Sequence, residues 1–406
     1  MTRMADEPRP LAATPGGVRD AAPPRSGPEA LAALAADAGI RRVHIVAWRD
    51  LDDPEAGGSE LHAHMVASKW AAAGLDVTFR TSAVPDAPTA LSRDGYRVLR
   101  RAGRYAVFPG AAWEGLRMGH PPGDALVEIW NGMPFFSPLW ARCPRVVFLH
   151  HVHAEMWKMV LPDGMAKAGY FLERRLAPPV YQRSRIITLS SSSKAEIMEL
   201  LGLRAENISI VPPGVEPQFS PGSGRSGTPL VVAVGRLVPV KRFDLLIEGL
   251  VRLKPRHPEL RAVIAGEGYE RPSLEQAIRR AGAEEWISLP GYVRQGELID
   301  LYRKAWVVAS SSLREGWGMT VTEAGACGTP AVVSRIAGHA DAVVEGESGL
   351  LFDDTDAMVD ALDSVIGDDV FRKRLGMGAV EHAARFSWEA TARAVLGVLA
   401  LEARRP

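Results

Sequence analysis

The sequence predicts an α/β protein with two domains, each built around a parallel sheet. Short apolar runs alternate with longer helix-compatible segments along most of the 406 residues, which favours strands joined by crossover helices. Several runs lead into glycine-containing loops, and parallel sheets bind ligands at the carboxyl ends of their strands. The alternation stops in a stretch rich in proline and glycine, residues 211–229, and then starts again. The chain therefore divides there into two domains.

Composition and charge indicate a globular protein that acts on small molecules. Hydrophobic residues make up 47% of the chain, which is enough for two cores, and Lys+Arg equals Asp+Glu at 48 each. A nucleic-acid-binding protein needs a basic surface, so zero net charge argues against that class. The two cysteines, Cys143 and Cys327, lie far apart and form neither a disulfide framework nor a metal-ligand cluster. A reducing compartment fits this composition.

The first forty residues lack the pattern of a folded domain. Residues 1–28 are rich in Pro, Ala, Gly and Arg without apolar periodicity, so they bury too little surface to fold. The next segment contains Glu29 and Asp37 and lacks the continuous apolar core of a signal peptide. We expect residues 1–40 to be a disordered tail. No run reaches the roughly 18 apolar residues of a membrane span, and we expect a cytoplasmic protein, at most peripheral at the inner face of the membrane.

The first domain, expected over residues 41–213, begins with a strand, a glycine pair and a helix. Residues 43–48 predict the strand, Gly57 and Gly58 open the helix, and residues 76–80 predict the next strand. The unit lacks the G-x-G-x-x-G sequence of dinucleotide-binding proteins, so a nicotinamide cofactor is not indicated. The glycine pair is either part of a ligand site or a plain tight turn before a helix.

A histidine cluster follows a predicted buried strand. Residues 145–149 read as this strand, and they run directly into a His-His-Val-His sequence at residues 150–153. Neighbouring residues of a strand point to opposite faces, so only His151 and His153 can share a side, and a third metal ligand is not evident nearby. We therefore do not expect a metal site here. A structural histidine with satisfied hydrogen bonds is the alternative to a role in a site.

Two acidic sequences match the D-x-D pattern of divalent-metal sites. They are Asp50-Leu51-Asp52 and Asp354-Thr355-Asp356. We expect the first to be a solvated loop and the second to be a helix N-cap followed by first-turn acids. No metal ion is therefore expected.

Residues 158–185 combine basic side chains with Met, Leu, Phe and Tyr. The basic residues are Lys158, Lys167, Arg174, Arg175, Arg183 and Arg185. Such a stretch can contact anionic lipid or a lipid-phosphate ligand, and a solvated helix face is the other interpretation. Peripheral contact with a membrane through residues 158–185 is thus one of two expectations for this region.

The second domain, expected over residues 229–385, repeats the pattern of strand, glycine and helix. A strand at residues 230–234 leads into Gly235 and Arg236 and then to Lys241. Later strands lead to Gly266-Glu267-Gly268 and to Tyr292-Val293. Because the carboxyl ends of parallel strands share one edge of a sheet, we expect these loops to lie together.

One stretch, residues 306–330, carries the most specific signal. It reads as a short buried strand, a glycine-rich loop and a helix over residues 320–327. Gly316 and Gly318 lack a β-carbon, so backbone N–H groups at the helix start can approach an anion, which the helix dipole also favours. The stretch therefore predicts an anion site.

Two carboxylates, Glu315 and Glu323, flank this anion site. Acidic groups beside bound anions are unusual unless they accept hydrogen bonds from hydroxyls. A sugar and a ribose on either side of a diphosphate would supply such hydroxyls. The stretch from Glu315 to Glu323 resembles the E-x7-E element of retaining glycosyltransferases of family 4.

The resemblance extends over residues 41–390 and implies the GT-B fold. In this fold two Rossmann-like α/β domains have parallel sheets that face a deep interdomain cleft. The implied division is a first domain that binds the acceptor (41–213), a linker (214–228), a second domain that binds a nucleotide-sugar donor (229–385) and a C-terminal helix that crosses back to the first domain (386–406).

The resemblance also implies which residues form the site. Those implied in catalysis are Glu315, His150, Arg236 and Lys241, with the two basic residues neutralising the diphosphate in place of a metal. Those implied in donor binding are Gly57, Gly58, Arg236, Lys241, Gly266, Glu267, Gly268, Tyr292, Val293, Glu315, Gly316, Trp317, Gly318, Met319, Thr320 and Glu323. Candidates on the acceptor side are Glu60, His151, His153 and Asn131. Trp317 departs from the family, which usually has phenylalanine there, and this departure bears on the shape of the sugar pocket.

The expected activity is metal-independent, retaining transfer of a hexose-type sugar from UDP-, GDP- or another nucleoside-diphosphate sugar to a glycan, lipid or small-molecule acceptor. No cofactor and no nucleic-acid partner are expected. The alternatives are a nucleotide-sugar epimerase or hydrolase of the same fold and a non-catalytic nucleotide-sugar-binding protein. A glycosidase that uses Glu315 and Glu323 is disfavoured, because it would need no diphosphate clamp.

Overall fold

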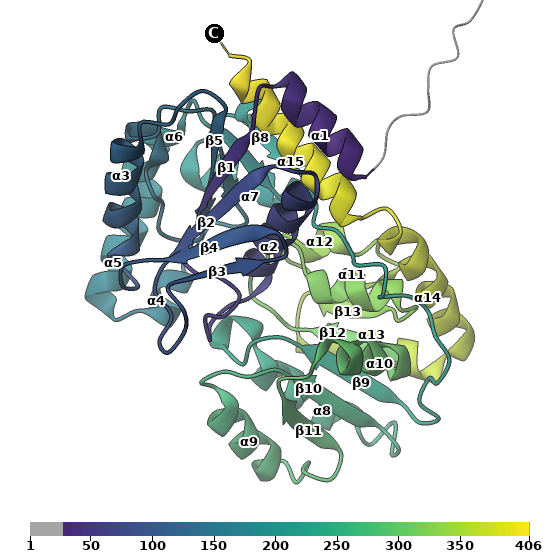
Figure 1. Cartoon of the computed structure of the whole chain (residues 1–406). Helices are drawn as coiled ribbons and strands as arrows, with labels where there is room; N and C mark the ends of the chain where they lie inside the picture. The colour runs from purple at the N-terminus through teal and green to yellow at the C-terminus, as the bar shows by residue number, and fades with distance from the viewer. Residues whose placement is uncertain (1–26, 406) are drawn as a thin grey trace, which may run out of the picture.

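The computed structural model describes residues 27–405 and shows two α/β domains, one in the purple to teal part of Figure 1 and one in the green part. The first sheet has the strand order β3-β4-β2-β1-β5-β6-β7-β8, and its neighbours run parallel except in the β3–β4 hairpin. Its strands are β1 (Arg42–Val46), β2 (Asp76–Thr81), β3 (Ala90–Arg93), β4 (Tyr96–Arg100), β5 (Asp124–Trp130), β6 (Arg145–Leu149), β7 (Arg185–Thr188) and β8 (Ile208–Ile210).

Crossover helices connect the parallel strands of the first domain. They are α2 (Gly58–Ala72), α3 (Val107–Met118), α4 (Met156–Val160), α5 (Asp163–Phe171), α6 (Ala177–Tyr181) and α7 (Ser191–Leu201), with the short 3₁₀ turns η1 (Ser137–Leu139) and η3 (Ala205–Asn207). A π-helical segment, η2 (Leu172–Leu176), joins α5 to α6. Such segments are rare and often occur beside functional sites, and this one carries the buried Glu173.

The second sheet is parallel throughout, with the strand order β11-β10-β9-β12-β13-β14. Its strands are β9 (Leu230–Val234), β10 (Arg261–Ala265), β11 (Ile287–Gly291), β12 (Val307–Ser310), β13 (Ala331–Ser334) and β14 (Gly349–Phe352). Its helices are η4 (Pro239–Lys241), α8 (Phe243–Leu253), α9 (Arg271–Arg280), α10 (Gln295–Lys304), α11 (Met319–Ala326), α12 (His339–Ala342), α13 (Thr355–Gly367) and α14 (Asp369–Ala383). The predicted pair of parallel α/β sheets is therefore confirmed.

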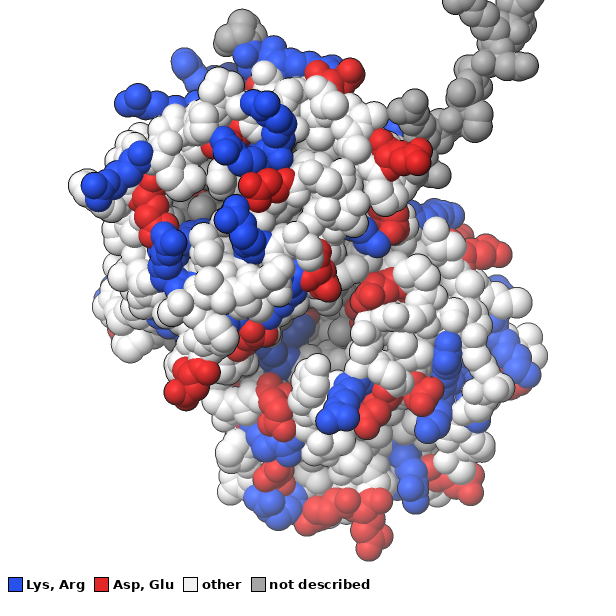
Figure 2. Space-filling model, in the orientation of Figure 1, with Lys and Arg blue, Asp and Glu red and all other residues white. Residues whose placement is uncertain are grey.

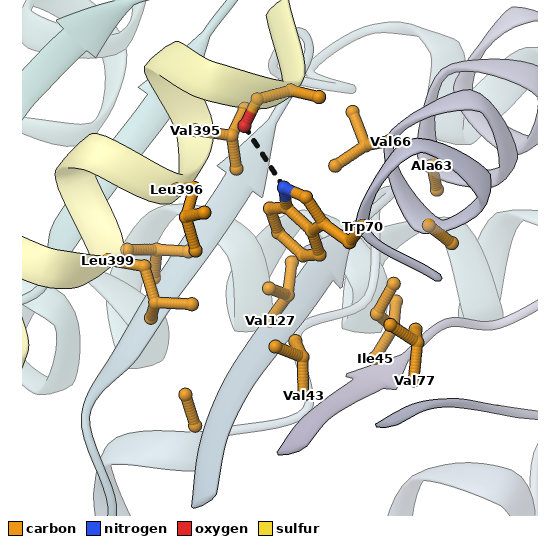
Figure 3. Close-up of a cluster of buried hydrophobic side chains, with 14 of the residues drawn as sticks. Val43, Ile45, Ala63, Val66, Trp70, Val77, Val127, Val395, Leu396 and Leu399 are labelled. Atoms are coloured by element: carbon orange, nitrogen blue, oxygen red, sulfur yellow. Dashed lines mark hydrogen bonds between the residues drawn. The ribbon is translucent and has the colours of Figure 1, made fainter. Parts of the chain in front are cut away.

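The last helix, α15 (Trp388–Ala403), returns to the first domain, as expected from the sequence. Its apolar face joins the core of the first sheet, and the Trp70 indole on α2 donates a hydrogen bond of 3.0 Å to the Ala392 carbonyl (Figure 3). Val395, Leu396 and Leu399 of α15 lie in the same cluster. The C-terminal helix is thus tied to the core of the first sheet.

The N-terminal helix α1 (Pro28–Asp37) corrects the expectation that residues 1–40 are a disordered tail. Leu31 and Ala35 are buried on its inner face, and α1 lies beside α15 in Figure 1. A single ten-residue helix is marginal by itself in water, so tertiary contact with α15 accounts for its order. Residues 1–26 of that expectation lie outside the described residues.

Trp70→Ala is expected to destabilise the protein by about 3–5 kcal/mol. Trp70 is fully buried between α2 and α15, so the substitution opens a cavity and removes the indole hydrogen bond to Ala392. Thermal unfolding in the absence of ligand would measure the loss. Trp113→Ala is the matched control, because 62% of Trp113 is exposed. An equal loss in both variants would contradict the role of Trp70 in holding α15.

Candidate functional site

The candidate site lies where the carboxyl ends of the two sheets meet. Figure 2 shows a hollow between the two lobes with basic side chains inside it. The β1–α2 and β6–α4 loops of the first domain contact the β9–η4 and β12–α11 loops of the second. Such an edge is the usual ligand position in parallel α/β sheets.

The β12–α11 loop contacts the first domain through Gly316. A Cβ at Gly316 would lie 2.8 Å from the His150 carbonyl oxygen, so a side chain there would push the loops apart. Gly318 has φ 101° and immediately precedes α11, a left-handed conformation that favours glycine. Met319 and Thr320 then form the first turn of α11. The backbone geometry thus presents a helix N-terminus at the domain boundary.

Glu315 and Lys241 form an ion pair within this edge. The Ser312 hydroxyl also donates to the Glu315 carboxylate at 2.8 Å. Burial alone would raise the pKa of Glu315, but Lys241, His339 and the Ser312 hydroxyl outweigh it and lower this pKa to about 2. Glu315 is therefore an ionised carboxylate at neutral pH.

Arg236 reaches from the second domain to the glycine pair of the first. Its Nη1 donates to the Glu55 carbonyl at 3.1 Å, and a Cβ at Gly57 would lie 3.3 Å from its Nε. A Cβ at Gly58 would lie 3.5 Å from the Met319 sulfur. The glycine pair therefore faces the second domain rather than forming only a turn. Arg236 and Lys241 belong to the same connection from β9 to α8.

The His150 side chain lies inside the first domain, and its predicted role in the site stays a prediction. His150 is buried in the first domain, where its Nε2 lies 3.2 Å from Nδ1 of His62 and its ring packs edge-on against that ring. Burial and the neighbouring His151 lower the pKa of His150 to about 4. The carbonyl of His150 lies against Gly316 of the β12–α11 loop.

His151 instead faces the second domain. Burial lowers its pKa to about 4, and the charged groups that act on this pKa are Glu315, Arg314, Arg236 and Lys241. Its Nε2 has no hydrogen-bond partner among residues 27–405. His151 is therefore neutral at pH 7, and its Nε2 is buried without a protein partner within the described residues.

The loop that carries these histidines is held by Glu173 from the π-helical segment. The Glu173 carboxylate accepts hydrogen bonds from the backbone N–H of His153 at 2.8 Å and of Ala154 at 3.0 Å, and from the Trp157 indole at 2.9 Å. His153 packs against Gly132 and stacks on His151 with ring centroids 5.1 Å apart. His153 thus supports the His151 ring.

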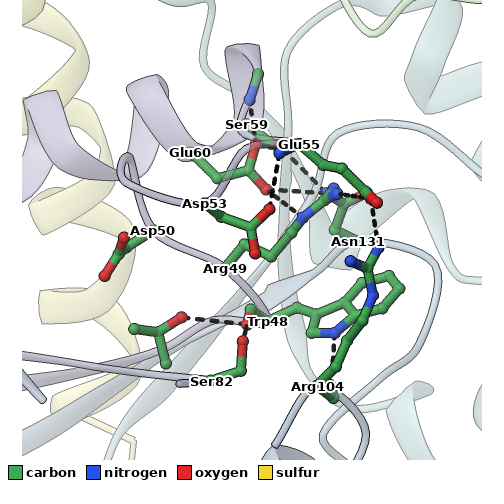
Figure 4. A network of polar contacts seen from close by, with 12 residues as sticks. Trp48, Arg49, Asp50, Asp53, Glu55, Ser59, Glu60, Ser82, Arg104 and Asn131 are labelled. Atoms are coloured by element: carbon green, nitrogen blue, oxygen red, sulfur yellow. Dashed lines mark hydrogen bonds and ion pairs between the residues drawn. The ribbon is translucent and has the colours of Figure 1, made fainter. Parts of the chain in front are cut away.

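A polar network closes the first-domain side of the site (Figure 4). Glu60 accepts hydrogen bonds from the Gly57 N–H and from the Ser59 hydroxyl, both at 2.8 Å. The Asn131 amide donates to the Ser59 hydroxyl at 3.0 Å. Glu60 and Asn131, which we predicted on the acceptor side, therefore lie together and fix the glycine pair.

The acidic side chains of the two D-x-D sequences form ion pairs or hydrogen bonds with other groups of the protein. Asp50 is buried, not solvated as we expected, because Arg100 pairs with it at 2.7 Å, and Arg100 and Arg93 both pair with Asp52. Asp354 accepts a hydrogen bond from the Ala357 N–H, as an N-cap does. Within residues 27–405, no group of three or more His, Cys, Asp or Glu residues is arranged to hold a metal ion.

The remaining donor-side candidates fall into two groups. Gly266 and Gly268 let the β10–α9 loop pass close to the β9–η4 loop, since their Cβ atoms would lie 1.9 Å from the Gly235 oxygen and 2.2 Å from the Leu237 oxygen. At the rim, the Glu267 carboxylate pairs with Arg271. Tyr292 is largely exposed and the adjacent Val293 is partly buried.

Trp317 lies in a core rather than in a pocket. Its ring is buried in a cluster with Leu189 and Val321 and packs edge-on against Phe386 at 5.0 Å. The Trp317 ring thus lies toward the segment that leads into α15, and a contact between Trp317 and the donor stays a prediction.

Glu323 lies on α11 in the second domain and accepts a hydrogen bond of 3.3 Å from the Tyr302 hydroxyl. Burial, with a smaller effect of nearby Glu216, outweighs the Tyr302 hydrogen bond and raises the pKa of Glu323 to about 8. The two glutamates of E-x7-E therefore differ in charge at pH 7. Glu315 is ionised, and Glu323 is largely protonated.

Two interdomain contacts were not predicted from the sequence. Arg314, next to Glu315, pairs with Glu196 on α7 and donates to the Val152 carbonyl at 3.3 Å. Asp341 of α12 accepts hydrogen bonds from the N-terminal backbone of α7, at Ser191 and Ser192. A basic residue directly before Glu315 is the only sequence signal that could have indicated the first contact.

Residues 158–185 form α4, α5, η2 and α6 on the surface of the first domain. Exposed apolar side chains lie among the basic ones, and the Arg174 guanidinium lies 5.4 Å from the Tyr170 ring. Contact with a membrane stays a prediction. Over the part of the chain that the structure describes, no helix has the length and apolarity to cross a bilayer.

Comparison with known proteins agrees with this geometry. The family described as "Glycosyltransferase Family 4" matches residues 56–219, and the family "Glycosyl transferases group 1" matches residues 216–382. The D-inositol 3-phosphate glycosyltransferase of Stackebrandtia nassauensis is 30% identical over 88% of this chain and 91% of that protein. The enzyme of the same name from Corynebacterium glutamicum is 39% identical over 46% of this chain and 50% of that protein.

Solved structures share the fold. Sucrose-phosphate synthase from Thermosynechococcus elongatus has a TM-score of 0.75 at 19% identity, over 87% of this chain and 97% of that one. Anabaena Alr3699/HepE in complex with UDP and glucose has a TM-score of 0.69 at 18% identity, over 87% and 98%. The two facing parallel-sheet domains are thus those of a GT-B glycosyltransferase. The sequence matches also establish the family. The chain belongs to glycosyltransferase family 4.

Proposed function

We propose that the protein transfers a hexose-type sugar from a nucleoside-diphosphate sugar to a small phosphorylated polyol, with retention at the anomeric carbon and without a metal. The observation that carries this proposal is the convergence of Arg236, Lys241 and the N-terminus of α11 at one edge of the cleft. Two cations and a helix N-terminus suit a diphosphate. The acceptor class is supported by the names of the relatives, which are D-inositol 3-phosphate glycosyltransferases.

In this proposal, the basic residues supply the main catalytic effect. Negative charge grows on the diphosphate as the glycosidic bond breaks, and preorganised donors stabilise that charge more than the ground state. Lys241 moves from Glu315 to the phosphates when the donor binds. Glu315 then lies beside the sugar, where a carboxylate stabilises positive charge developing at the anomeric carbon.

A panel of nucleotide sugars tests the proposal. A donor at about 100 times its dissociation constant should stabilise the protein by about 2.7 kcal/mol in thermal unfolding, and the stabilising donor is then incubated with D-inositol 3-phosphate. The expected product is a glycoside with the anomeric configuration of the donor. Donor turnover without acceptor would indicate an epimerase or hydrolase, and tight binding without turnover would indicate a nucleotide-sugar-binding protein. Rapid hydrolysis of simple glycosides would indicate a glycosidase.

His151→Ala is expected to lower transfer more than it lowers donor affinity. The neutral His151 ring faces Glu315 and Arg236 across the cleft, so it contacts the sugar or acceptor after both have bound. His150→Ala is the matched control, because that ring lies in the first-domain core against His62. The measurement is kcat and KM for both variants. Full activity in His151→Ala with loss in His150→Ala would reverse the assignment.

Activity is expected to survive EDTA. The phosphates are neutralised by Arg236 and Lys241 in this proposal, and Asp50 and Asp52 are already paired with arginines. Transfer rates would be compared before and after chelation at equal ionic strength. A loss that magnesium or manganese restores would replace the proposed basic clamp with a metal-dependent one.

A further inference from the structure

A cluster of arginines at the first-domain side of the cleft surrounds one carboxylate. Glu55, in the β1–α2 loop, accepts a hydrogen bond of 3.0 Å from Arg49 and pairs with Arg104 through the same oxygen. Its own carbonyl accepts the hydrogen bond from Arg236. In Figure 4 the Glu55 carboxylate points toward Arg49 and Arg104. Glu55 therefore pairs with two first-domain arginines through its side chain and with Arg236 of the second domain through its backbone.

The two first-domain arginines are held in place without Glu55. The guanidinium groups of Arg49 and Arg104 lie 5.1 and 5.2 Å from the Trp48 ring centroid, and the Trp48 indole donates to the Arg104 carbonyl at 2.7 Å. The Arg49 side chain is only 8% exposed, and its Nε lies 3.4 Å from a Glu60 oxygen. This Nε has no hydrogen-bond partner within the described part of the chain. Trp48 and Glu60 thus position the two arginines independently of Glu55.

Glu55 is the least fixed member of the cluster. Its side chain is 52% exposed, whereas Glu60 beside it is buried and holds the start of α2. The Arg104 hydrogen bond, with smaller effects of Arg49 and Arg236, lowers the pKa of Glu55. An ionised, exposed carboxylate can rotate toward solvent at small cost, and a phosphate group would then meet the arginines with bidentate geometry.

We propose that Arg49 and Arg104 bind the phosphate group of the acceptor, and that Glu55 occupies this subsite as a substitute anion until the acceptor arrives. The inference rests on the proposed function, because it assigns the acceptor's phosphate to particular residues. With Glu55 turned away, a phosphate dianion and Glu60 together balance the three arginines. The Arg236 contact places the subsite beside the proposed donor clamp, where an acceptor must lie to react.

Two substitutions test this subsite. Arg104→Ala is expected to weaken binding of D-inositol 3-phosphate at least about tenfold, since a charge-assisted hydrogen bond is lost, while the weaker binding of free inositol stays unchanged. Glu55→Gln keeps the shape but removes the competing charge, and it is expected to tighten binding of D-inositol 3-phosphate several-fold. Both side chains are largely exposed, so both variants should fold. Arg97→Ala, at a surface pair with Asp76, is the matched control.

Calorimetric binding and transfer would both be measured, with inorganic phosphate as a further probe. Equal effects of Arg104→Ala on inositol and its phosphate would overturn the subsite, as would weaker phosphate binding in Glu55→Gln. If D-inositol 3-phosphate binds with the expected response to both substitutions and no sugar is transferred to it, the subsite stands and the proposed function fails. If transfer proceeds and neither substitution changes the acceptor KM, the function stands and the subsite fails.

Discussion

Lys241→Ala is expected to lower turnover by about a hundredfold or more. The substitution removes one of the two cations that would neutralise the leaving diphosphate, so the loss is larger in the transition state than in the bound donor. It also leaves Glu315 without its ion-pair partner. An unpaired carboxylate then faces the incoming diphosphate, and the like charges repel. Both effects lower the turnover of the variant.

The measurement for Lys241→Ala is kcat together with the affinity for the free nucleoside diphosphate. Affinity for the diphosphate should also fall. Lys373→Ala is the matched control, because Lys373 belongs to the same domain and forms an exposed surface pair with Asp369. Thermal unfolding would verify that the variant is folded. Wild-type diphosphate affinity and turnover in Lys241→Ala would remove the basic clamp from the proposed mechanism.

The sequence was sufficient to predict two parallel sheets and the loops at their edges, but not the β3–β4 hairpin or β8. Buried parallel strands such as β9 and β12 are short continuous apolar runs, and such runs carry their signal locally. Glycines after strands carry a local signal as well. Gly316 and Gly318 lie at a domain contact and a left-handed turn, which are positions where a side chain is costly.

Side-chain directions and long-range partners could not be predicted in the same way. The alternation rule for a strand holds only within the strand, and β6 ends at Leu149. The directions of His150 and His151 therefore depend on a loop that Glu173 of the π-helical segment η2 fixes. Asp50 was expected to be solvated because its partner, Arg100, lies fifty residues away. Helix α1 has no strong signal by itself and is ordered by α15 at the other end of the chain.

The E-x7-E element shows what could and what could not be predicted from the sequence. Its strand, loop and helix were predicted from local pattern, and the structure confirms them at β12 and α11. The different charges of Glu315 and Glu323 were not predictable. They depend on Lys241 at the end of η4, which pairs with Glu315, and on the burial of Glu323 near Glu216, so they are properties of the folded environment.

Glu323→Gln is expected mainly to weaken donor binding. Because burial raises the pKa of Glu323 to about 8, the side chain is largely neutral at pH 7 and can exchange hydrogen bonds with ribose hydroxyls. Glutamine is also neutral, but its amide cannot reproduce the hydroxyl of a protonated carboxyl group. The donor dissociation constant should rise several-fold with kcat nearly unchanged. A drop in kcat without a change in donor affinity would place Glu323 next to the transferred sugar instead.

Glu315→Gln is expected to have the opposite effect, lowering turnover by about a hundredfold with nucleoside-diphosphate affinity nearly intact. Glu315 is ionised because Lys241, His339 and Ser312 hold its pKa at about 2. Its charge would stabilise the anomeric carbon only while that carbon becomes positive, so the loss appears in the transition state. Lys241 remains free to bind the phosphates in this variant, which preserves diphosphate affinity. Trapping of a covalent glycosyl-enzyme in Glu315→Gln, or unchanged turnover, would show that Glu315 is not the carboxylate that stabilises the sugar.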